Sequence, residues 1–401
     1  MKYRELEMPK RGDTVVVGLS GGVDSTTAAL MLKEKGCNVI GVTMALWKGN
    51  EAKFPAEFVS HDSCYSPKEE LDIEDCKVFC RQNGIEYHVI DVKDAYEKMV
   101  LENFKEEYRS GRTPNPCIRC NRFIKFGALL AGIEKIGINY DYFCTGHYAK
   151  LVRGEENLAS LYGESSSKAE EGLLRPAQIA TAMDLSKDQA YFLYRIPSKV
   201  LEKVRFPLSG LSKKEVFAFA REKGLKAAEK EESQDFIPSQ FLDVLFSDRP
   251  SVPGDIIDMD GKVLGKHRGI EHYTIGQRRG LGVSSTEPLY VAEIDPVKNL
   301  VVLGKEGDLS SSALIADDLV WPADYNPKTK FKAMVKIRLA SRPVEALIEP
   351  YEACDGEKII GDAVKVTFKE KQRAVAPGQS VVFYIDGVTA GGGVIARAIK
   401  D

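Results

Sequence analysis

The sequence contains few cysteines and no long apolar run. Its eight cysteines are spread over 401 residues, which is too sparse for a disulfide-stapled scaffold. We therefore expect reduced thiols that serve packing, catalysis or metal ligation. No window reaches the roughly 18 uninterrupted apolar residues of a membrane span, and the charged first residues lack the apolar core of a secretory signal. We expect a cytoplasmic protein with no membrane partner.

A large excess of charge of one sign is also lacking. The chain has 56 lysines and arginines against 59 aspartates and glutamates, which gives a formal net charge of −3. This balance argues against a protein that coats nucleic acid non-specifically. It leaves room for local basic surfaces that hold one folded RNA.

Strands and helices alternate in the first half of the chain. The predicted strands are residues 14–19, 37–44, 86–92 and 142–146, and the predicted helices are residues 24–35 and 73–83. Each strand is a short apolar, β-branched run, and each helical pattern ends at a glycine or beside one. This alternation predicts an α/β fold with a doubly wound parallel sheet, which binds its ligand at the carboxyl ends of the strands.

The second half has a different character. After a charged amphipathic helix over residues 212–224, short β-type runs alternate with glycine, proline and aspartate turns. The predicted strands are residues 290–294, 301–303, 331–338, 363–368 and 380–384, and the polar residues 154–176 are predicted to form a loop. We therefore divide the chain into a parallel-sheet domain (1–205), a small central domain (206–312) and a C-terminal β-barrel (313–401).

A glycine- and serine-rich motif follows the first predicted strand. It consists of Gly18, Leu19, Ser20, Gly21, Gly22, Val23, Asp24 and Ser25. Glycines let the backbone turn tightly so that consecutive N–H groups point inward, hydroxyls add donors, and the following helix contributes its positive end. Such a loop suits pyrophosphate, and Asp24 would hold Mg²⁺ or orient the loop. The Gly-Lys-Ser/Thr ending of a Walker A loop is absent.

This motif resembles the PP-loop of N-type ATP pyrophosphatases, which cleave ATP between the α- and β-phosphates and adenylate a substrate oxygen. The superfamily also includes GMP, NAD and argininosuccinate synthetases. The resemblance therefore implies a PP-loop domain and ATP as co-substrate, and it leaves the acceptor open.

Further segments resemble one family, the tRNA-specific 2-thiouridylases, along nearly the whole chain. They are residues 113–127 (with Cys-Ile-Arg-Cys at 117–120), 145–149, 187–193, 272–282, 376–380 and 391–395. Several ordered blocks are more specific than any one of them. The resemblance implies a sulfurtransferase that adenylates the C2 oxygen of the anticodon wobble uridine with ATP and replaces it with sulfur, releasing AMP and pyrophosphate. Its partners would be tRNA and a sulfur-donor protein or free sulfide.

The same resemblance implies roles for single residues. The glycine-serine motif would bind the ATP phosphates together with Mg²⁺, and Met44 and Gly146 would contact the adenosine. Cys120 matches the nucleophilic cysteine of the family, and Cys117 and Asp24 are further catalytic candidates. The expected tRNA contacts are Asn115, Pro116, Cys117, Lys187, Asp188, Gln189, Arg278, Arg279 and Arg338.

Some of these residues also have plain structural interpretations. Met44 fits a core position, Gly146 fits a tight turn, and the neighbouring His147 is more typical of a packing histidine than of a base. Arg278 and Arg279 could form a solvated charge pair, although the flanking glycines favour a loop that faces RNA.

The chemistry requires an activated base and a reactive thiol. Adenylation converts the C2 oxygen of uracil into part of a good leaving group, AMP, so that C2 can accept a soft sulfur nucleophile. A thiolate carries that sulfur, and the position of the cysteine pair near a helix start and Arg119 is expected to lower the thiol pKa. The base must also be unstacked before its C2 can be reached.

One segment departs from the family pattern. Members usually carry a second cysteine in a segment such as Ser-Gln-Asp-Ile-Cys-Phe-Ile, but here Asp235 is followed directly by Phe236. Either Cys117 replaces that partner and shares persulfide transfer with Cys120, or both cysteines bind an iron–sulfur cluster with a third ligand such as Asp235. Zinc is disfavoured because no second Cys-X-X-Cys or paired histidines follow.

Two other functions are compatible with the phosphate motif. The first is a PP-loop ligase that acts on a small molecule, which would have no need of the Cys-X-X-Cys segment. The second is a non-catalytic tRNA-binding or sulfur-carrier protein, in which an intact Ser20, Asp24 and Ser25 would have no purpose.

Overall fold

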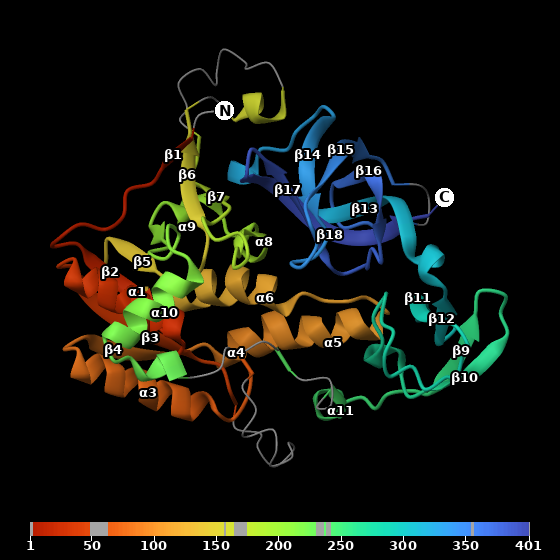
Figure 1. Ribbon diagram of the computed structural model, residues 1–401, viewed down its shortest axis with the longest axis horizontal. Coiled ribbons are helices and arrows are strands. Elements are labelled where there is room, and N and C mark those ends of the chain that lie inside the picture. The colour runs from red at the N-terminus through yellow and green to blue at the C-terminus, as the bar shows by residue number, and fades with distance from the viewer. Residues whose placement is uncertain are drawn as a thin grey trace.

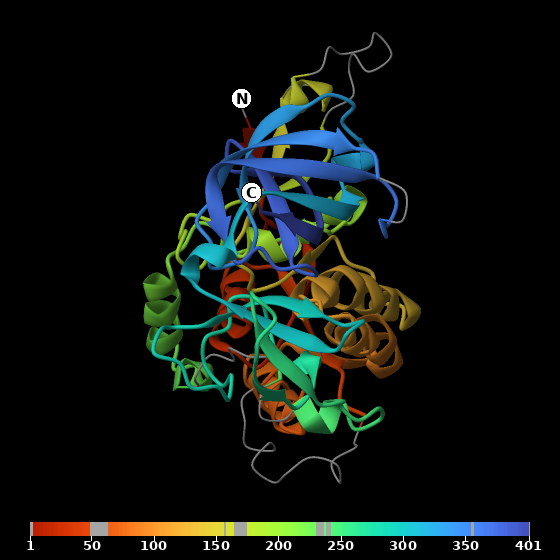
Figure 2. The same cartoon turned by 90° about the vertical axis from the view of Figure 1, so that its right-hand side faces the viewer.

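The computed structural model describes residues 3–48, 63–155, 158–163, 175–229, 236–237, 242–353 and 357–400. Within these ranges the strands form sheets of five, four and nine members. In Figure 1 the five-stranded sheet and its helices lie on the left, the barrel lies at the upper right, and the small sheet lies at the lower right. Figure 2 looks from the barrel side and shows the barrel above the small sheet.

The five-stranded sheet is parallel throughout. Its order is β4 (Glu86–Asp91), β3 (Asn38–Ala45), β2 (Thr14–Gly18), β5 (Tyr142–Cys144) and β8 (Val204–Arg205). Three successive valines of the central strand are 0% exposed, because both faces of the sheet are covered. The predicted doubly wound parallel sheet is therefore confirmed.

Helices cover the two faces of this sheet. One face packs against α1 (Val23–Glu34), α3 (Glu69–Gln82) and α10 (Lys213–Glu222). The other face packs against a helical hairpin. Segments of π-helix interrupt the α-helices of this hairpin, a feature common at functional sites. The hairpin consists of α4 (Lys93–Tyr96), η2 (Glu97–Leu101), α5 (Glu102–Arg109), α6 (Pro116–Arg119), η3 (Cys120–Ala128) and α7 (Leu129–Lys135).

The central domain contains a small sheet with a linear strand order. Its strands are β10 (Val263–His267), β9 (Gly254–Asp258), β12 (Leu300–Gly304) and β11 (Tyr290–Asp295). The pair β12 and β9 is parallel, whereas the outer pairs are antiparallel. The amphipathic helix predicted from residue 212 is α10, which begins at a capping box formed by Ser212 and Glu215.

The C-terminal barrel closes on itself with six antiparallel strands. They follow the order β18 (Val388–Ile399), β13 (Ser310–Val320), β16 (Ala363–Arg373), β15 (Val344–Tyr351), β14 (Phe331–Lys336) and β17 (Ser380–Ile385), and β17 pairs again with β18. The predicted barrel is confirmed, and sequence patterns missed β13, β15 and β18.

The barrel sheet continues into the first domain. Strand β18 pairs through Val388 with Ala180 of β7 (Gln178–Ala180), β7 pairs with β6 (Lys150–Gly154), and β6 pairs with β1 (Tyr3–Glu5). Hydrogen-bonded strands therefore join the barrel to the parallel-sheet domain. No helix within the described ranges is long and apolar enough to cross a membrane.

Candidate active site

The glycine-serine motif forms a tight turn between β2 and α1. The backbone N–H of Ser20 donates to Oγ of Ser25 (3.2 Å), and the two hydroxyl oxygens lie 3.3 Å apart. The hydroxyl of Ser25 also lies 3.1 Å from the carbonyl oxygen of Gly22. Gly21 adopts a φ of +74°, which favours glycine over every other residue. The turn ends at the first residues of a twelve-residue helix, where phosphate groups bind well.

Asp24 is held by two side chains from elsewhere in the fold. Its carboxylate oxygens both lie 2.8 Å from Nζ of Lys213, and the hydroxyl of Tyr148 donates to Oδ1 at 2.9 Å. Lys213 is 8% exposed, and its ammonium lies over the rings of Tyr148 and Phe217. The ammonium group of Lys213 therefore lies beside the loop, and no sequence pattern predicted it there.

Gly146 lies directly against this loop. A Cβ atom at Gly146 would come within 2.8 Å of the backbone carbon of Asp24 and the backbone nitrogen of Ser25. Only a residue without a side chain allows this approach between the end of β5 and the start of α1. Met44, near the end of the adjacent strand β3, is half-buried and packs against the main core.

Asp72 of α3 is a further acidic group at the loop. A Cβ atom at Gly21 would lie 3.4 Å from Oδ1 of Asp72. Glu69, one turn earlier, accepts hydrogen bonds from the backbone nitrogens of Leu46 and Trp47, which fixes α3 to the end of β3. Nothing in the spacing of the sequence pointed to either carboxylate.

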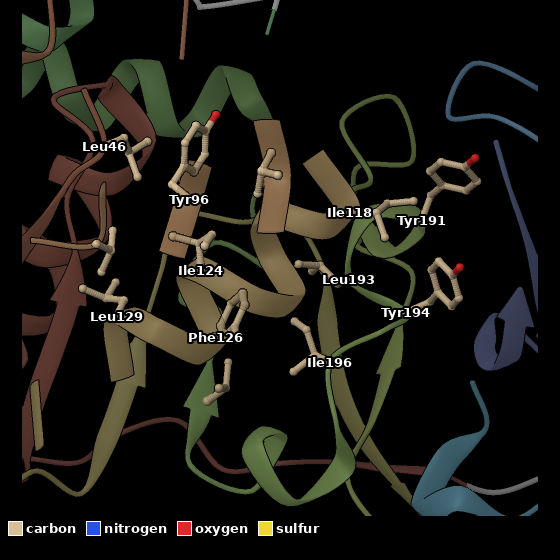
Figure 3. Close-up of a cluster of buried hydrophobic side chains, with 14 of the residues drawn as sticks. Leu46, Tyr96, Ile118, Ile124, Phe126, Leu129, Tyr191, Leu193, Tyr194 and Ile196 are labelled. Atoms are coloured by element: carbon tan, nitrogen blue, oxygen red, sulfur yellow. The ribbon is translucent and has the colours of Figure 1, made fainter. Parts of the chain in front are cut away.

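The cysteine pair lies on a short helix that runs into a π-helix. Asn115 caps α6 by accepting a hydrogen bond from the backbone nitrogen of Ile118. Cys117 is exposed, Cys120 is half-buried, and Ile118 between them is in the core. Figure 3 shows Ile118 among the side chains of this core, together with Tyr96 and Ile124.

The expected lowering of the thiol pKa values is wrong. Part of the Cys117 side chain is accessible to solvent, but protein atoms surround most of it, and this burial raises the pKa of its thiol to about 12. Burial likewise raises the pKa of Cys120 to about 11. Lys125 opposes both shifts through its positive charge. Arg119 does not face the thiols, because its Nε donates to the carbonyl of Met99 (2.8 Å) and its guanidinium lies over Phe123.

A loop of the barrel holds the segment that precedes the cysteines. The amide Nε2 of Gln379 donates to the carbonyl oxygens of Thr113 and Pro114, each at 3.0 Å. The backbone nitrogen of Thr113 donates to the carbonyl of Pro377 at 2.7 Å. Sequence blocks 113–127 and 376–380, which are more than 240 residues apart, thus meet in space.

The residues expected to contact tRNA near position 188 have internal partners. Oδ1 of Asp188 accepts from the backbone nitrogens of Ala182 (2.9 Å) and Ala190 (3.4 Å). Gln189 exchanges hydrogen bonds with the backbone of Tyr148. These side chains hold the loop that follows β7, and Lys187 beside them is half-buried.

The three arginines expected to contact tRNA differ in exposure. Arg278 and Arg279 are exposed on a loop that contains left-handed glycines, including Gly276 and Gly280. Arg338 is half-buried, and its Nη2 donates to the carbonyls of Arg373 (2.8 Å) and Ala374 (2.7 Å). Asn115 and Pro116 are half-buried beside the thiols.

Other polar candidates are packing residues. His147 is 9% exposed, and its Nδ1 lies 2.7 Å from the hydroxyl of Thr145, as expected for a packing histidine. Cys76 and Cys80 are both 0% exposed in the core beneath α3. Asp235 lies outside the described residues, so its suggested role as a ligand is not placed.

The described part of the chain contains no group of three histidine, cysteine, aspartate or glutamate side chains that could hold a metal ion. The parallel sheet and its glycine-serine loop place the chain in the PP-loop class, and a pair of thiols lies in the same domain.

Comparisons with known proteins narrow this class. Residues 13–238 match the family described as tRNA methyl transferase HUP domain, residues 240–305 the tRNA methyl transferase PRC-barrel domain, and residues 311–395 the aminomethyltransferase beta-barrel domain. The chain is 43% identical to tRNA-specific 2-thiouridylase MnmA of Endomicrobium trichonymphae over 383 residues, covering 95% of this chain and 98% of that one. It is 41% identical to tRNA-specific 2-thiouridylase MnmA 2 of Thermoanaerobacter pseudethanolicus, covering 96% and 98%.

The chain therefore belongs to the family of tRNA-specific 2-thiouridylases, which are ATP-dependent enzymes. The family descriptions mention methyl transfer, but the relatives that match along the full length are named as thiouridylases. A solved NMN synthetase from Francisella tularensis is 15% identical, covers 65% of this chain and 82% of its own, and has a TM-score of 0.28, a likeness too weak to bear on function.

Proposed function

We propose that the protein adenylates the C2 oxygen of the anticodon wobble uridine of tRNA and replaces that oxygen with sulfur. The products are 2-thiouridine, AMP and pyrophosphate. The observation that carries this proposal is the pairing of a phosphate loop with a cysteine pair in one domain, in a chain that matches thiouridylases over 95% of its length. The tRNA substrate would be met in the cytoplasm.

The phosphate loop would do the activation chemistry. The backbone donors of residues 18–25, the hydroxyls of Ser20 and Ser25 and the ammonium of Lys213 would stabilise negative charge on the ATP phosphates as AMP is transferred. Asp24 and Asp72 are the carboxylates beside the loop that fit Mg²⁺, which would neutralise phosphate charge there. Met44 and Gly146 would border the adenosine.

Sulfur delivery would fall to Cys120 with Cys117 as its partner. Cys120 would carry a persulfide to the activated C2, and Cys117 would close a disulfide as sulfur leaves. The alternative is an iron–sulfur cluster at the same two cysteines. We favour the thiol pair, because two cysteines are too few for a usual four-thiolate cluster site.

The RNA would be held by exposed basic groups and by the segment beside the thiols. Arg278 and Arg279 would contact phosphates, and Asn115 and Pro116 would border the unstacked base. Lys187, Asp188, Gln189 and Arg338 remain proposed tRNA contacts that would act partly by shaping their loops. A sulfur-donor protein or free sulfide would complete the reaction.

One experiment tests the proposed function. Protein purified without oxygen is incubated with ATP, unmodified tRNA and sulfide, and the digested tRNA is analysed for 2-thiouridine while AMP is measured. We expect both products, and we expect Cys120→Ser to form no thiouridine with a persulfide donor. AMP formation that depends on a small amine instead of tRNA would indicate a ligase, and neither product would indicate a non-catalytic protein.

A further inference from the structure

A third cysteine, Cys64, lies on a turn beside α4, the helix that contacts the π-helix beginning at Cys120. The turn that carries it comes just before α3, and its flanking residues Ser63, Tyr65 and Ser66 are buried, whereas Cys64 itself is exposed. The hydroxyl of Ser66 donates to the carbonyl of Ser63 and that of Ser63 to the carbonyl of Tyr65, each at 3.4 Å. The turn therefore presents the thiol at a fixed place while its neighbours anchor it.

Tyr96 links this turn to the cysteine helix. The ring of Tyr65 stacks on the ring of Tyr96, with centroids 5.5 Å apart and planes 20° apart. Tyr96 is 1% exposed and belongs to the same core cluster as Ile118, which lies between Cys117 and Cys120. Figure 3 shows both side chains in this core. The turn at residue 64 thus packs against Tyr96 of α4, and α4 in turn contacts the π-helix that begins at Cys120.

The electrostatics agree with this arrangement. Burial first, and then the charges of Cys120, Cys64 and Cys117, raise the pKa of the Tyr96 hydroxyl. After burial, Cys64 contributes to the raised pKa of Cys117, and it also contributes to that of Cys120. Charges affect one another in this way only over limited distances, which agrees with a turn at residue 64 and a cysteine helix that both lie near Tyr96.

We infer that Cys64 is the thiol that accepts sulfur from the donor and passes it to Cys120. This inference rests on the proposed function and completes it. The segment that carries the second cysteine in relatives has lost its Ile-Cys pair here, and the Phe236 that follows packs its ring 4.9 Å from that of Phe104. Cys64 and Cys117 are exposed and Cys120 is half-buried, which suits transfer from a surface thiol to an inner one.

The proposed steps balance in atoms and electrons. The Cys64 thiolate attacks the outer sulfur of a persulfide on the donor, a new S–S bond forms, and the donor cysteine leaves as a thiolate. The Cys120 thiolate then takes that sulfur from Cys64 and becomes the persulfide. Its terminal sulfur attacks C2 of the adenylated uridine, and AMP leaves with the former C2 oxygen.

Release of the product uses the remaining thiol. The Cys117 thiolate attacks Sγ of Cys120, the bond between Sγ and the uridine sulfur breaks, and its electron pair stays on the uridine sulfur. A Cys117–Cys120 disulfide forms, so the thiol pair supplies the two electrons that reduce the transferred sulfur. An external dithiol reductant restores the pair by thiol–disulfide exchange.

The test compares two sulfur sources. Cys64→Ser and a matched control, Cys76→Ala in the buried face of α3, are assayed with ³⁵S-labelled glutathione persulfide or with excess inorganic sulfide. With the persulfide we expect thiouridine formation to fall at least about tenfold in Cys64→Ser and to be unchanged in the control. With sulfide, which can attack C2 directly, we expect the wild-type yield from both variants. The pyrophosphate released by adenylation in a single turnover should be unchanged throughout, because that step precedes sulfur transfer.

Mapping of the label gives a second readout. After alkylation and digestion, Cys120→Ser should accumulate label on Cys64, and Cys64→Ser should carry none on Cys120. Label on Cys120 at the wild-type level in Cys64→Ser would overturn the inference. So would a visible charge-transfer band of the anaerobic protein that Cys64→Ser abolishes, since this would make Cys64 a cluster ligand. Wild-type protein that makes no thiouridine from either source would instead refute the proposed function.

Discussion

Replacement of Asp24 by asparagine should reveal how strongly the phosphate loop is coupled to α10. The substitution keeps the shape and one acceptor oxygen but removes the charge that faces Lys213 at 2.8 Å. Removal of one partner from a buried ion pair costs about 3–5 kcal/mol. Here 31% of the Asp24 side chain and 11% of the Lys213 side chain are accessible, so water screens part of the charge. We expect a loss of about 2 kcal/mol in the free energy of unfolding.

A double-mutant cycle in urea isolates the pair. Asp24→Asn, Lys213→Met and the double variant should give a coupling free energy of about 1–2 kcal/mol. A second ion pair, between Lys223 and Glu34 at the other end of the same two helices, serves as the matched control. Its charged atoms are 2.7 Å apart, and 30% and 43% of the two side chains are accessible. Its cycle should give no more than about 0.5 kcal/mol.

The same variants test the activity of the loop. Because Asp24 is the second residue of α1, loss of its anchor should displace the donors that face the phosphates. AMP formation should fall at least about tenfold in Asp24→Asn, equivalent to ~1.4 kcal/mol of lost transition-state stabilisation. Two results would refute this reasoning: a coupling energy no larger than that of the surface pair, or unchanged AMP formation in Asp24→Asn.

Four further predictions follow from the site. Gly146→Ala should lower the free energy of unfolding by about 1–3 kcal/mol and reduce AMP formation, because its methyl group would overlap the start of α1; a wild-type melting temperature would contradict this. Burial raises the pKa values of Cys117 and Cys120 to about 12 and about 11, so the rate of persulfide-dependent thiolation should rise roughly tenfold per pH unit from pH 7 to 9, and a flat profile would contradict it. Burial places the pKa of His147 well below its ordinary value, so the unfolded chain binds the proton before the folded chain does. The free energy of unfolding, measured in urea, should therefore fall below about pH 6.5, and it should fall less steeply with pH in His147→Gln. Gln379→Ala removes two hydrogen bonds to the segment before the cysteines and should reduce thiolation, while the pyrophosphate released by adenylation in a single turnover stays unchanged; equal effects on both would contradict a positioning role.

The parts of the site that could be predicted are local in sequence. The phosphate loop is a strand, a glycine-serine turn and a helix start within about a dozen residues, and each of these has its own pattern. The parallel sheet follows from alternation of such units. Lys213 could not be predicted, because 189 residues separate it from Asp24 and it reads as one lysine of a charged helix.

The strands that sequence patterns missed also have a physical explanation. β18 contains Gly391, Gly392 and Gly393, a run that is typical of a turn. Here the glycines make room for neighbours, because a side chain at Gly391 would overlap the ring of Trp321 and one at Gly392 would meet Tyr194. A glycine in a strand can thus indicate close packing as well as a break, and sequence alone does not separate the two.

The error in the thiol pKa values has the most consequence for mechanism. A cysteine pair next to Arg119 and a helix start predicts reactive thiolates only if the guanidinium faces the sulfurs. In the structure that guanidinium turns to the carbonyl of Met99, and Cys120 packs against the core that contains Tyr96 and Ile118. Burial then dominates and keeps Cys117 and Cys120 protonated at neutral pH. A pair of this kind needs its sulfur brought to it already activated, which is the role that an exposed neighbouring thiol at Cys64 can perform.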